Sequence, residues 1–91
     1  MLEATFTKQF EKDVKLAQRR GKDLQKMKEV VQFLLENKLL AAKYRDHWLT
    51  GTYVNRRECH LAPDWLLIYE PRKHENQIIF ERLGTHSDLF K

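Results

Sequence analysis

The sequence predicts an α+β fold in which an N-terminal strand and two helices pack on a small antiparallel sheet. Between residues 7 and 36, apolar side chains recur at spacings of three and four, which places them on one face of each helix. From residue 53 onward, three runs rich in aromatic and aliphatic residues are separated by turn signals. Strands joined by short turns pair antiparallel, so we expect the helices to cover one face of such a sheet.

Composition limits the class of protein. The chain has 91 residues, of which 42% are hydrophobic and 33% charged, as in a folded globular protein. A chain this short encloses one core, so we expect a single domain over residues 1–91. The lone Cys59 excludes an intramolecular disulfide, and no apolar run approaches the ~20 residues of a membrane span, so we expect a cytoplasmic protein without membrane contact. The formal charge of +4 favours a polyanion or an acidic protein as partner.

The first 36 residues supply the predicted strand and both helices. Residues 2–6 alternate between apolar and polar side chains, which suits a short strand. Thr7 is a suitable cap for a helix that runs to about Arg20 and ends at Gly21, and a second helix is expected from residue 22 or 23 to residue 36. The predicted apolar stripes are Phe10, Val14 and Ala17 in the first helix, and Leu24, Met27, Val31, Leu34 and Leu35 in the second.

Basic side chains follow the same spacing on the first predicted helix. They recur at intervals of four, three and four, so they form one ridge. We call this the basic ridge, and it consists of Lys8, Lys12, Lys15 and Arg19. We expect it to face solvent and to be able to contact a phosphate backbone.

The second half of the chain predicts a loop and a three-stranded meander. Residues 39–52 lack clean periodicity and read as an ordered loop. The expected strands run from Tyr53 to Leu61, from Trp65 to Glu70 and from Gln77 to Leu83. The middle strand is apolar on both faces, so the face away from the helices must be covered by the loop or by the C-terminal tail.

Four polar residues stand near the ends of these strands. His47 precedes the meander, His60 and Asp64 flank its first tight turn, and His86 follows its last strand. RNA cleavage without a metal needs a base for the 2′-hydroxyl and an acid for the leaving 5′-oxygen. Histidine suits both roles because its pKa lies near neutrality. We therefore interpret these four residues as a candidate catalytic set.

Other residues would complete such a site. Asp64 is expected to orient His60, Arg82 to neutralise charge on the phosphate, and the rings of Phe90 and Trp65 to support an unstacked base. A structural alternative exists for each of them: an isolated histidine is more often solvated than catalytic, and Trp65 beside an apolar run is more often part of the core. A metal site built from the same histidines and carboxylate is a further reading, although no HxxxH or HExxH helix supports it.

Three segments of the chain resemble the YafQ branch of the RelE/ParE toxin superfamily: KDVKLAQRRGKD, YRDHWLTGTYVNRRECHLAPDWLLIY and FERLGTHSDLF. The most specific parts are the pair Asp46-His47, the block from His60 to Tyr69, and the block from Arg82 to Phe90. The resemblance covers nearly the whole chain.

This resemblance implies a RelE-like fold and a bacterial endoribonuclease, the toxin of a type II toxin–antitoxin pair. Such toxins enter the ribosomal A site and cut messenger RNA without a cofactor, leaving a 2′,3′-cyclic phosphate and a 5′-hydroxyl. The implied partners are a cognate antitoxin, the ribosome and messenger RNA, and the free toxin is expected to be a monomer that forms a hetero-oligomer with its antitoxin. By position, the implied site residues are His47, His60, Asp64 and His86 for catalysis, with Phe90 and Arg82 at the substrate.

The sequence leaves several alternatives open. His86 or His47 is a candidate base, another histidine a candidate acid, and Asp64 a candidate partner that holds His60 in one tautomer. A toxin that cuts free RNA without ribosomes needs the same groups. A non-catalytic module would instead bind RNA or protein through the basic ridge, with a steep salt dependence and no cut products.

Overall fold

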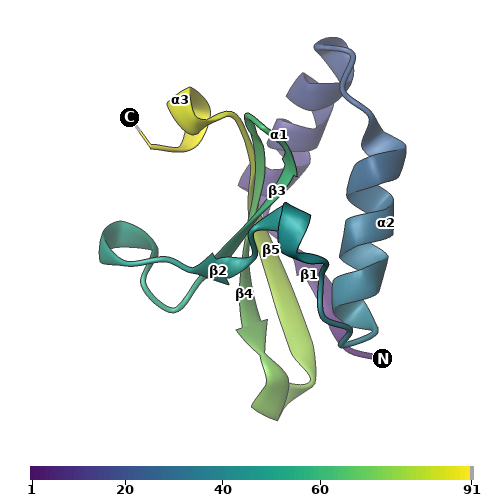
Figure 1. Cartoon of the computed structure of the whole chain (residues 1–91), viewed down its shortest axis with the longest axis vertical. Helices are drawn as coiled ribbons and strands as arrows, with labels where there is room; N and C mark the ends of the chain where they lie inside the picture. The colour runs from purple at the N-terminus through teal and green to yellow at the C-terminus, as the bar shows by residue number, and fades with distance from the viewer. Residues whose placement is uncertain (91) are drawn as a thin grey trace.

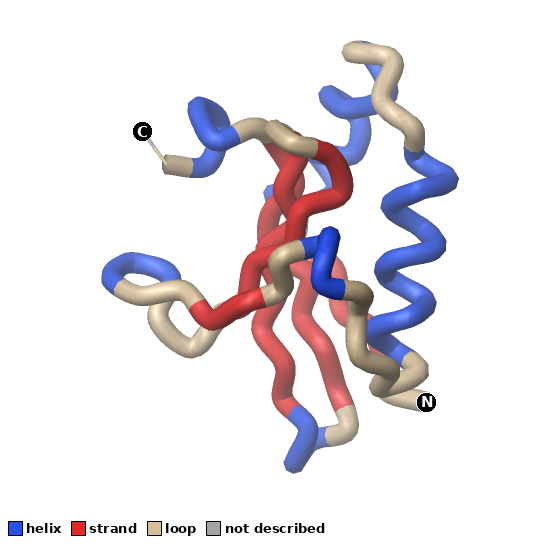
Figure 2. Tube along the Cα trace, in the orientation of Figure 1, coloured by secondary structure: helices blue, strands red, loops and turns tan. Residues whose placement is uncertain are grey.

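The computed structural model describes residues 1–90, whose strands form one mixed sheet in the order β1-β5-β4-β3-β2 (Figure 1). The two long helices lie on one side of this sheet, whereas the loop that follows β2 and the short helix α3 lie on the other (Figure 2). The elements are β1 Glu3–Phe6, α1 Lys8–Arg19, α2 Leu24–Leu35, β2 His47–Trp48, β3 Arg57–Ala62, β4 Trp65–Arg72, β5 Gln77–Gly84 and α3 His86–Leu89, with 3-10 turns η1 Ala42–Tyr44, η2 Gly51–Tyr53 and η3 Lys73–Glu75.

The predicted N-terminal strand and both long helices are confirmed. Thr7 Oγ1 accepts a hydrogen bond from the Phe10 amide at 2.9 Å, and Asp23 Oδ1 accepts one from the Lys26 amide at 3.2 Å, so each helix has a side-chain N-cap. Gly21 follows α1 with φ +74°, a conformation that favours glycine. No helix within residues 1–90 is both long and apolar enough to cross a membrane.

The main core lies between the helices and the sheet. Phe10 and Ala17 of α1 and Val30 and Val31 of α2 are buried against it. Alternate side chains of the strands point toward the same side of the sheet and contribute to this core. That contribution consists of Cys59, Leu61, Trp65, Leu67, Tyr69, Ile78, Phe80 and Leu83.

The sheet is mixed rather than purely antiparallel, which corrects the predicted pairing of one strand. β1 pairs in parallel with β5, from Glu3 opposite Gln77 to Phe6 opposite Phe80. The remaining pairs, β2 with β3, β3 with β4 and β4 with β5, are antiparallel. Turn signals report only pairing between neighbours in the chain, whereas β1 and β5 are joined by the whole intervening sequence.

The first meander strand begins later than predicted. β3 starts at Arg57 instead of Tyr53, because residues 51–53 form the 3-10 turn η2 and Asn55 adopts φ +68°, outside the extended region. The other two predicted strands are present as β4 and β5, and β4 runs two residues beyond Glu70 to Arg72.

The second face of the middle strand is covered by both of the predicted segments. Leu66 and Ile68 of β4 are fully buried there against Leu89 of α3, with Leu49 and Tyr53 of the loop packed around them. The short helix α3 replaces the irregular tail expected from the sequence. Both of the elements that cover this face also carry residues of the predicted site.

Candidate active site

Two of the predicted histidines meet at one buried carboxylate. Cys59 and Leu61 point into the main core, so His60 between them faces the other side of the sheet, and alternation places Glu58 on that side too. β2 then sets His47 opposite Glu58. Glu58 Oε2 lies 3.3 Å from His60 Nε2 and 3.4 Å from His47 Nε2, and the Glu58 side chain is only 6% exposed.

His47 is held in place by its neighbours in the chain. The Asp46 carboxylate accepts hydrogen bonds from the Tyr69 hydroxyl at 2.7 Å and from Arg57 Nε at 3.1 Å, which ties this segment to the sheet. Burial, followed by the bond to Asp46, raises the pKa of Tyr69, so its hydroxyl remains a donor. Arg45 adopts φ +49° and turns its carbonyl toward His47 Nδ1, which therefore carries the hydrogen.

The other two predicted residues form a second pair. Asp64 Oδ1 accepts hydrogen bonds from the His86 amide at 2.9 Å and from His86 Nδ1 at 2.6 Å. The bond from the backbone amide, followed by the bond from the ring, lowers the pKa of Asp64 and favours its ionised form. Asp64 was expected to orient His60; the structure pairs it with His86 instead, because α3 begins beside the β3–β4 turn, and Glu58 takes the place beside His60.

Three imidazole rings stand in a row along this face. The ring centres of His47 and His60 are 6.3 Å apart, and those of His60 and His86 are 5.8 Å apart. Phe90 continues the row at 6.3 Å from His86 and rests edge-on against Tyr53. With 43% of its surface exposed, Phe90 offers a ring to a base beside the histidines.

The helix that carries His86 is fixed by a capping box. Thr85 Oγ1 accepts from the Asp88 amide, and the Asp88 carboxylate accepts from the Thr85 amide at 3.0 Å. Arg20 at the end of α1 donates to Asp88 Oδ2 at 2.7 Å, and this bond holds the pKa of Asp88 well below its usual range. Gly84 fits closely beneath, because a Cβ there would lie 2.9 Å from the Asp88 Cβ.

Arg82 is engaged by another carboxylate. Its Nε donates to Asp13 Oδ2 at 2.9 Å, and this hydrogen bond raises the pKa of Arg82. The same Asp13 oxygen accepts from the Leu83 amide at 2.9 Å, on the edge of β5 that extends beyond β1. A phosphate would have to compete with Asp13, and the role of Arg82 at the substrate stays a prediction.

The expectation that Trp65 supports a base is wrong. Trp65 is only 3% exposed and belongs to the main core, so neither ring face is open to a ligand. Its indole Nε1 is buried without a hydrogen-bond partner among residues 1–90. The structural alternative recognised in the sequence is the correct one.

The basic ridge is exposed, as its spacing predicted. Lys8, Lys12, Lys15 and Arg19 all lie on the solvent side of α1. α1 packs on the sheet face opposite the histidine row, so the ridge and the row belong to different layers of the molecule. Its contact with RNA stays a prediction.

Three residues of the site were not predicted. Glu58 shares a face with His60 through the two-residue period of the strand, and this signal was available in the sequence. Arg45 and Tyr53 reach the site through irregular turns, for which no periodic signal exists.

The arrangement suits proton transfer at a bound phosphate. Imidazole nitrogens held by carboxylates and an adjacent exposed aromatic ring are the groups that acid–base cleavage of RNA uses. As they are placed within residues 1–90, the His, Cys, Asp and Glu side chains form no group of three or more that could hold a metal ion together. Acid–base chemistry by the histidines is supported by the contacts of their ring nitrogens with carboxylates.

Comparisons with known proteins identify the relatives of this chain. A family model described as the bacterial toxin of type II toxin–antitoxin system, YafQ, matches residues 2–91. The mRNA interferase toxin YafQ of Escherichia coli strain K12 is 45% identical over 86 residues, which cover 93% of this chain and 91% of that protein.

Solved structures show the same fold. A metal-bound toxin from Helicobacter pylori has a TM-score of 0.93 at 46% identity, over 99% of this chain and 100% of that one. A chain in the E. coli DinJ-YafQ complex has a TM-score of 0.91 at 41% identity, over the full length of both chains. The predicted RelE-like α+β architecture is confirmed. With a family model that spans residues 2–91 and relatives above 40% identity, this chain belongs to the YafQ family of bacterial toxins from type II toxin–antitoxin systems.

Proposed function

We propose that this chain is an endoribonuclease toxin that cuts messenger RNA in the ribosomal A site. The observation that carries the proposal is the row of three imidazole rings on one open face of the sheet, each with a ring nitrogen within 3.4 Å of a carboxylate oxygen. The relative in E. coli is named an mRNA interferase, which supports the same activity here.

The hydrogen bonds favour distinct roles for the three histidines. His86 Nδ1 donates a hydrogen bond to Asp64. Its Nε2 is therefore free to accept the proton of the 2′-hydroxyl. His60 faces Glu58 with Nε2, which leaves Nδ1 to protonate the leaving 5′-oxygen. His47 Nδ1 contacts the Arg45 carbonyl oxygen and its Nε2 contacts the Glu58 carboxylate, so neither ring nitrogen is free to contact the substrate. We assign the base to His86, the acid to His60 and a positioning role to His47.

These roles account for the products that we propose. Removal of the 2′-hydroxyl proton lets that oxygen attack the adjacent phosphorus, and protonation of the 5′-oxygen lets it leave. The new bond closes a 2′,3′-cyclic phosphate, and the broken bond yields a 5′-hydroxyl. Stacking of a base on Phe90 would hold the nucleotide next to His86 during this step.

An antitoxin partner is part of the proposal. The E. coli relative forms a complex with DinJ. The formal charge of +4 on this chain suits an acidic or amphipathic segment of a cognate antitoxin that binds over the site. We further propose that the free toxin is a monomer and that the complex is a hetero-oligomer.

The proposal is tested by single-turnover cleavage of messenger RNA on programmed ribosomes. Alanine variants at His47, His60, Asp64 and His86 are compared with His74→Ala, a matched control in the exposed turn η3 between β4 and β5. We expect His60→Ala and His86→Ala to slow cleavage by about 10²–10⁴-fold, the contribution of a general acid or base, and His74→Ala to match wild type. Near wild-type rates in most of the four site variants would remove the proposed site.

Two alternatives are separated by the same assay. If the wild-type protein cuts a free transcript as fast as ribosome-bound messenger RNA, the activity does not depend on the ribosome. If it binds RNA with a steep salt dependence but yields no cut product on either substrate, the chain is a binding module.

A further inference from the structure

A polar cavity lies beside the histidine row, at the open edge of the sheet. β2 pairs only with Arg57 and Glu58, so the end of β3 borders a space between α2 and η1 instead of another strand. The cavity measures about 420 Å³, within the volume range of small-ligand sites. Its polar lining comes from Lys26, Lys43, Tyr44, Arg45 and His60.

The lining of the cavity is positively charged. Lys26, Lys43 and Arg45 each carry a formal positive charge, and no carboxylate lines the cavity. Within residues 1–90, none of these three side chains forms an ion pair. By contrast, Arg56 and Arg82 are each paired with a carboxylate. Three cations without ion-pair partners around one cavity favour the binding of an anion there.

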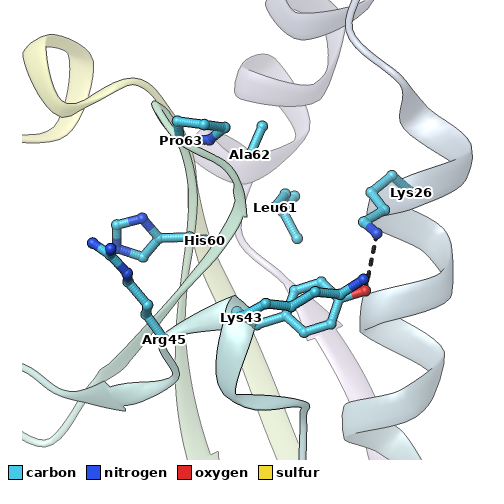
Figure 3. Close-up of a pocket in the computed structure, with 8 residues that line it drawn as sticks. Lys26, Lys43, Arg45, His60, Leu61, Ala62 and Pro63 are labelled. Atoms are coloured by element: carbon cyan, nitrogen blue, oxygen red, sulfur yellow. Dashed lines mark hydrogen bonds between the residues drawn. The ribbon is translucent and has the colours of Figure 1, made fainter.

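The cations are arranged around Tyr44. Lys26 Nζ reaches across from α2 and donates to the Tyr44 hydroxyl at 2.9 Å, and this bond raises the pKa of Lys26. The ammonium groups of Lys26 and Lys43 lie 4.9 and 5.3 Å from the centre of the Tyr44 ring. Figure 3 shows Lys26 on the α2 side of the cavity and Arg45 beside the His60 ring.

His60 joins this cavity to the catalytic row. Its ring lines the cavity and also stands between His47 and His86. A strand with its scissile phosphate at the row would therefore bring a neighbouring backbone phosphate to the cavity. We propose that the cavity bounded by Lys26, Lys43 and Arg45 is a subsite for the RNA phosphodiester next to the scissile one. The inference rests on the proposed function for the identity of its ligand.

The subsite would position the strand without taking part in the chemical step. Contacts to backbone phosphates fix the register of a nucleic acid and carry no sequence information. Neutralising the lysines should therefore weaken binding of RNA of any sequence, and should leave the saturating cleavage rate close to wild type.

Binding is measured by fluorescence anisotropy with a short RNA that is 2′-O-methylated throughout and so cannot be cleaved. A Lys26→Gln, Lys43→Gln double variant is compared with Lys28→Gln, Lys73→Gln, which loses the same charge at exposed positions outside the cavity. A Lys26→Arg, Lys43→Arg double variant keeps the charge and tests for a structural effect.

We expect the glutamine pair in the cavity to lower the slope of log affinity against log salt by about 0.7, the contribution of one phosphate contact on a single strand. The arginine pair and the control pair should keep the wild-type slope. Equal slopes in the cavity pair and the control pair, or no binding by the wild type at low salt, would overturn the subsite. If the glutamine pair in the cavity lost affinity for a polyglutamate peptide but kept wild-type affinity for RNA, the cavity would be a protein-binding site. That result would also overturn the RNA subsite.

A second experiment, on ribosomes, shows whether the bound phosphate belongs to messenger RNA or to ribosomal RNA. We expect the glutamine pair in the cavity to bind empty ribosomes as wild type does and to need more toxin for half-maximal cleavage on programmed ribosomes. Equal loss of affinity for empty ribosomes would place the phosphate on ribosomal RNA and refute the messenger assignment. Because the anisotropy measurement needs no cleavage, an inactive wild-type protein would count against the proposed function and not against the subsite.

Discussion

Each of the three histidines in the row has a different set of hydrogen-bond partners. Asp64 holds His86 through both the backbone amide and the ring, so the direction of the free Nε2 is fixed. Glu58 stands between His60 and His47, within 3.4 Å of a nitrogen of each. These differences in partners, rather than differences in exposure, distinguish the proposed base and acid from the positioning residue.

Glutamine variants of the histidines test this distinction. His60→Gln and His86→Gln remove proton transfer, so we expect single-turnover cleavage at saturating toxin to fall by about 10²–10⁴-fold. His47→Gln keeps an N–H donor that can bond the Arg45 carbonyl or the Glu58 carboxylate, so we expect it to lose far less. An equal loss in all three variants would show that His47 exchanges a proton with the substrate.

The sequence predicted which polar residues lie close together better than it predicted their pairing. His47, His60, Asp64 and His86 all lie on one face, because strand ends and turns bring them together. The partner of Asp64 could not be predicted, since it depends on α3, whose single turn is too short for a periodic signal. Trp65 was ambiguous because an aromatic residue beside an apolar run suits either a core or a binding surface.

At the scale of elements, α3 places both His86 and Phe90. It is only four residues long, so its position depends on its cap and on the contact between Arg20 and Asp88. The packing beneath it is tight, since Gly84 leaves no room for a side chain against Asp88.

Gly84→Ala should displace α3. The added methyl group would meet the Asp88 Cβ at 2.9 Å, so the carboxylate must move away from Thr85 and Arg20. We expect a loss of stability of about 1–3 kcal/mol, typical of overpacking, and a larger proportional loss of cleavage rate. Urea denaturation gives the first quantity and single-turnover cleavage the second. Wild-type values in both would mean that α3 tolerates the shift.

The same contact makes stability depend on pH. The bond from Arg20 lowers the pKa of folded Asp88 below the value of about 3.9 for an unfolded aspartate. Its contribution is therefore present above about pH 3.9 and is lost as the pH falls toward the folded value. We expect the difference in unfolding free energy between wild type and Asp88→Asn to be constant from pH 7 to 5 and to shrink below pH 4. A difference that grows in acid would contradict the assigned pairing.

Helices and antiparallel strands were predictable because their signals are local. The stripes of α1 and α2 and the turns of the meander each lie within a few residues of one another. The parallel pairing of β1 with β5 joins the two ends of the chain, and no local pattern reports it. The late start of β3 follows from the positive φ of Asn55, which the aromatic and β-branched residues around it obscured.

At the scale of the whole molecule, the sheet separates structure from chemistry. The helices and the main core occupy one side, and the histidine row lies on the other, above a small core of Leu66, Ile68 and Leu89. This division leaves the histidine row open to solvent, while the fold is stabilised mainly by the core on the opposite face of the sheet.

The metal requirement of cleavage can be tested on the whole protein. The relative from Helicobacter pylori was solved with a bound metal, whereas the donor side chains of residues 1–90 here, as they are placed, form no group of three or more that could hold a metal ion. We expect a zinc-selective chelator that leaves ribosomal magnesium in place to have no effect on cleavage. Activity that is lost with the chelator and restored by zinc would assign a metal to the reaction.

The most direct test of the proposed chemistry replaces a single atom of the substrate. Attack by the 2′-oxygen requires that oxygen at the cut nucleotide, so ribosome-bound messenger RNA with one 2′-deoxynucleotide at the cleavage position should remain intact there. The matched all-ribose messenger should be cut, with a cyclic phosphate and a 5′-hydroxyl at the new ends. Cleavage of the deoxy-substituted messenger at a comparable rate would contradict proton abstraction by the histidine row.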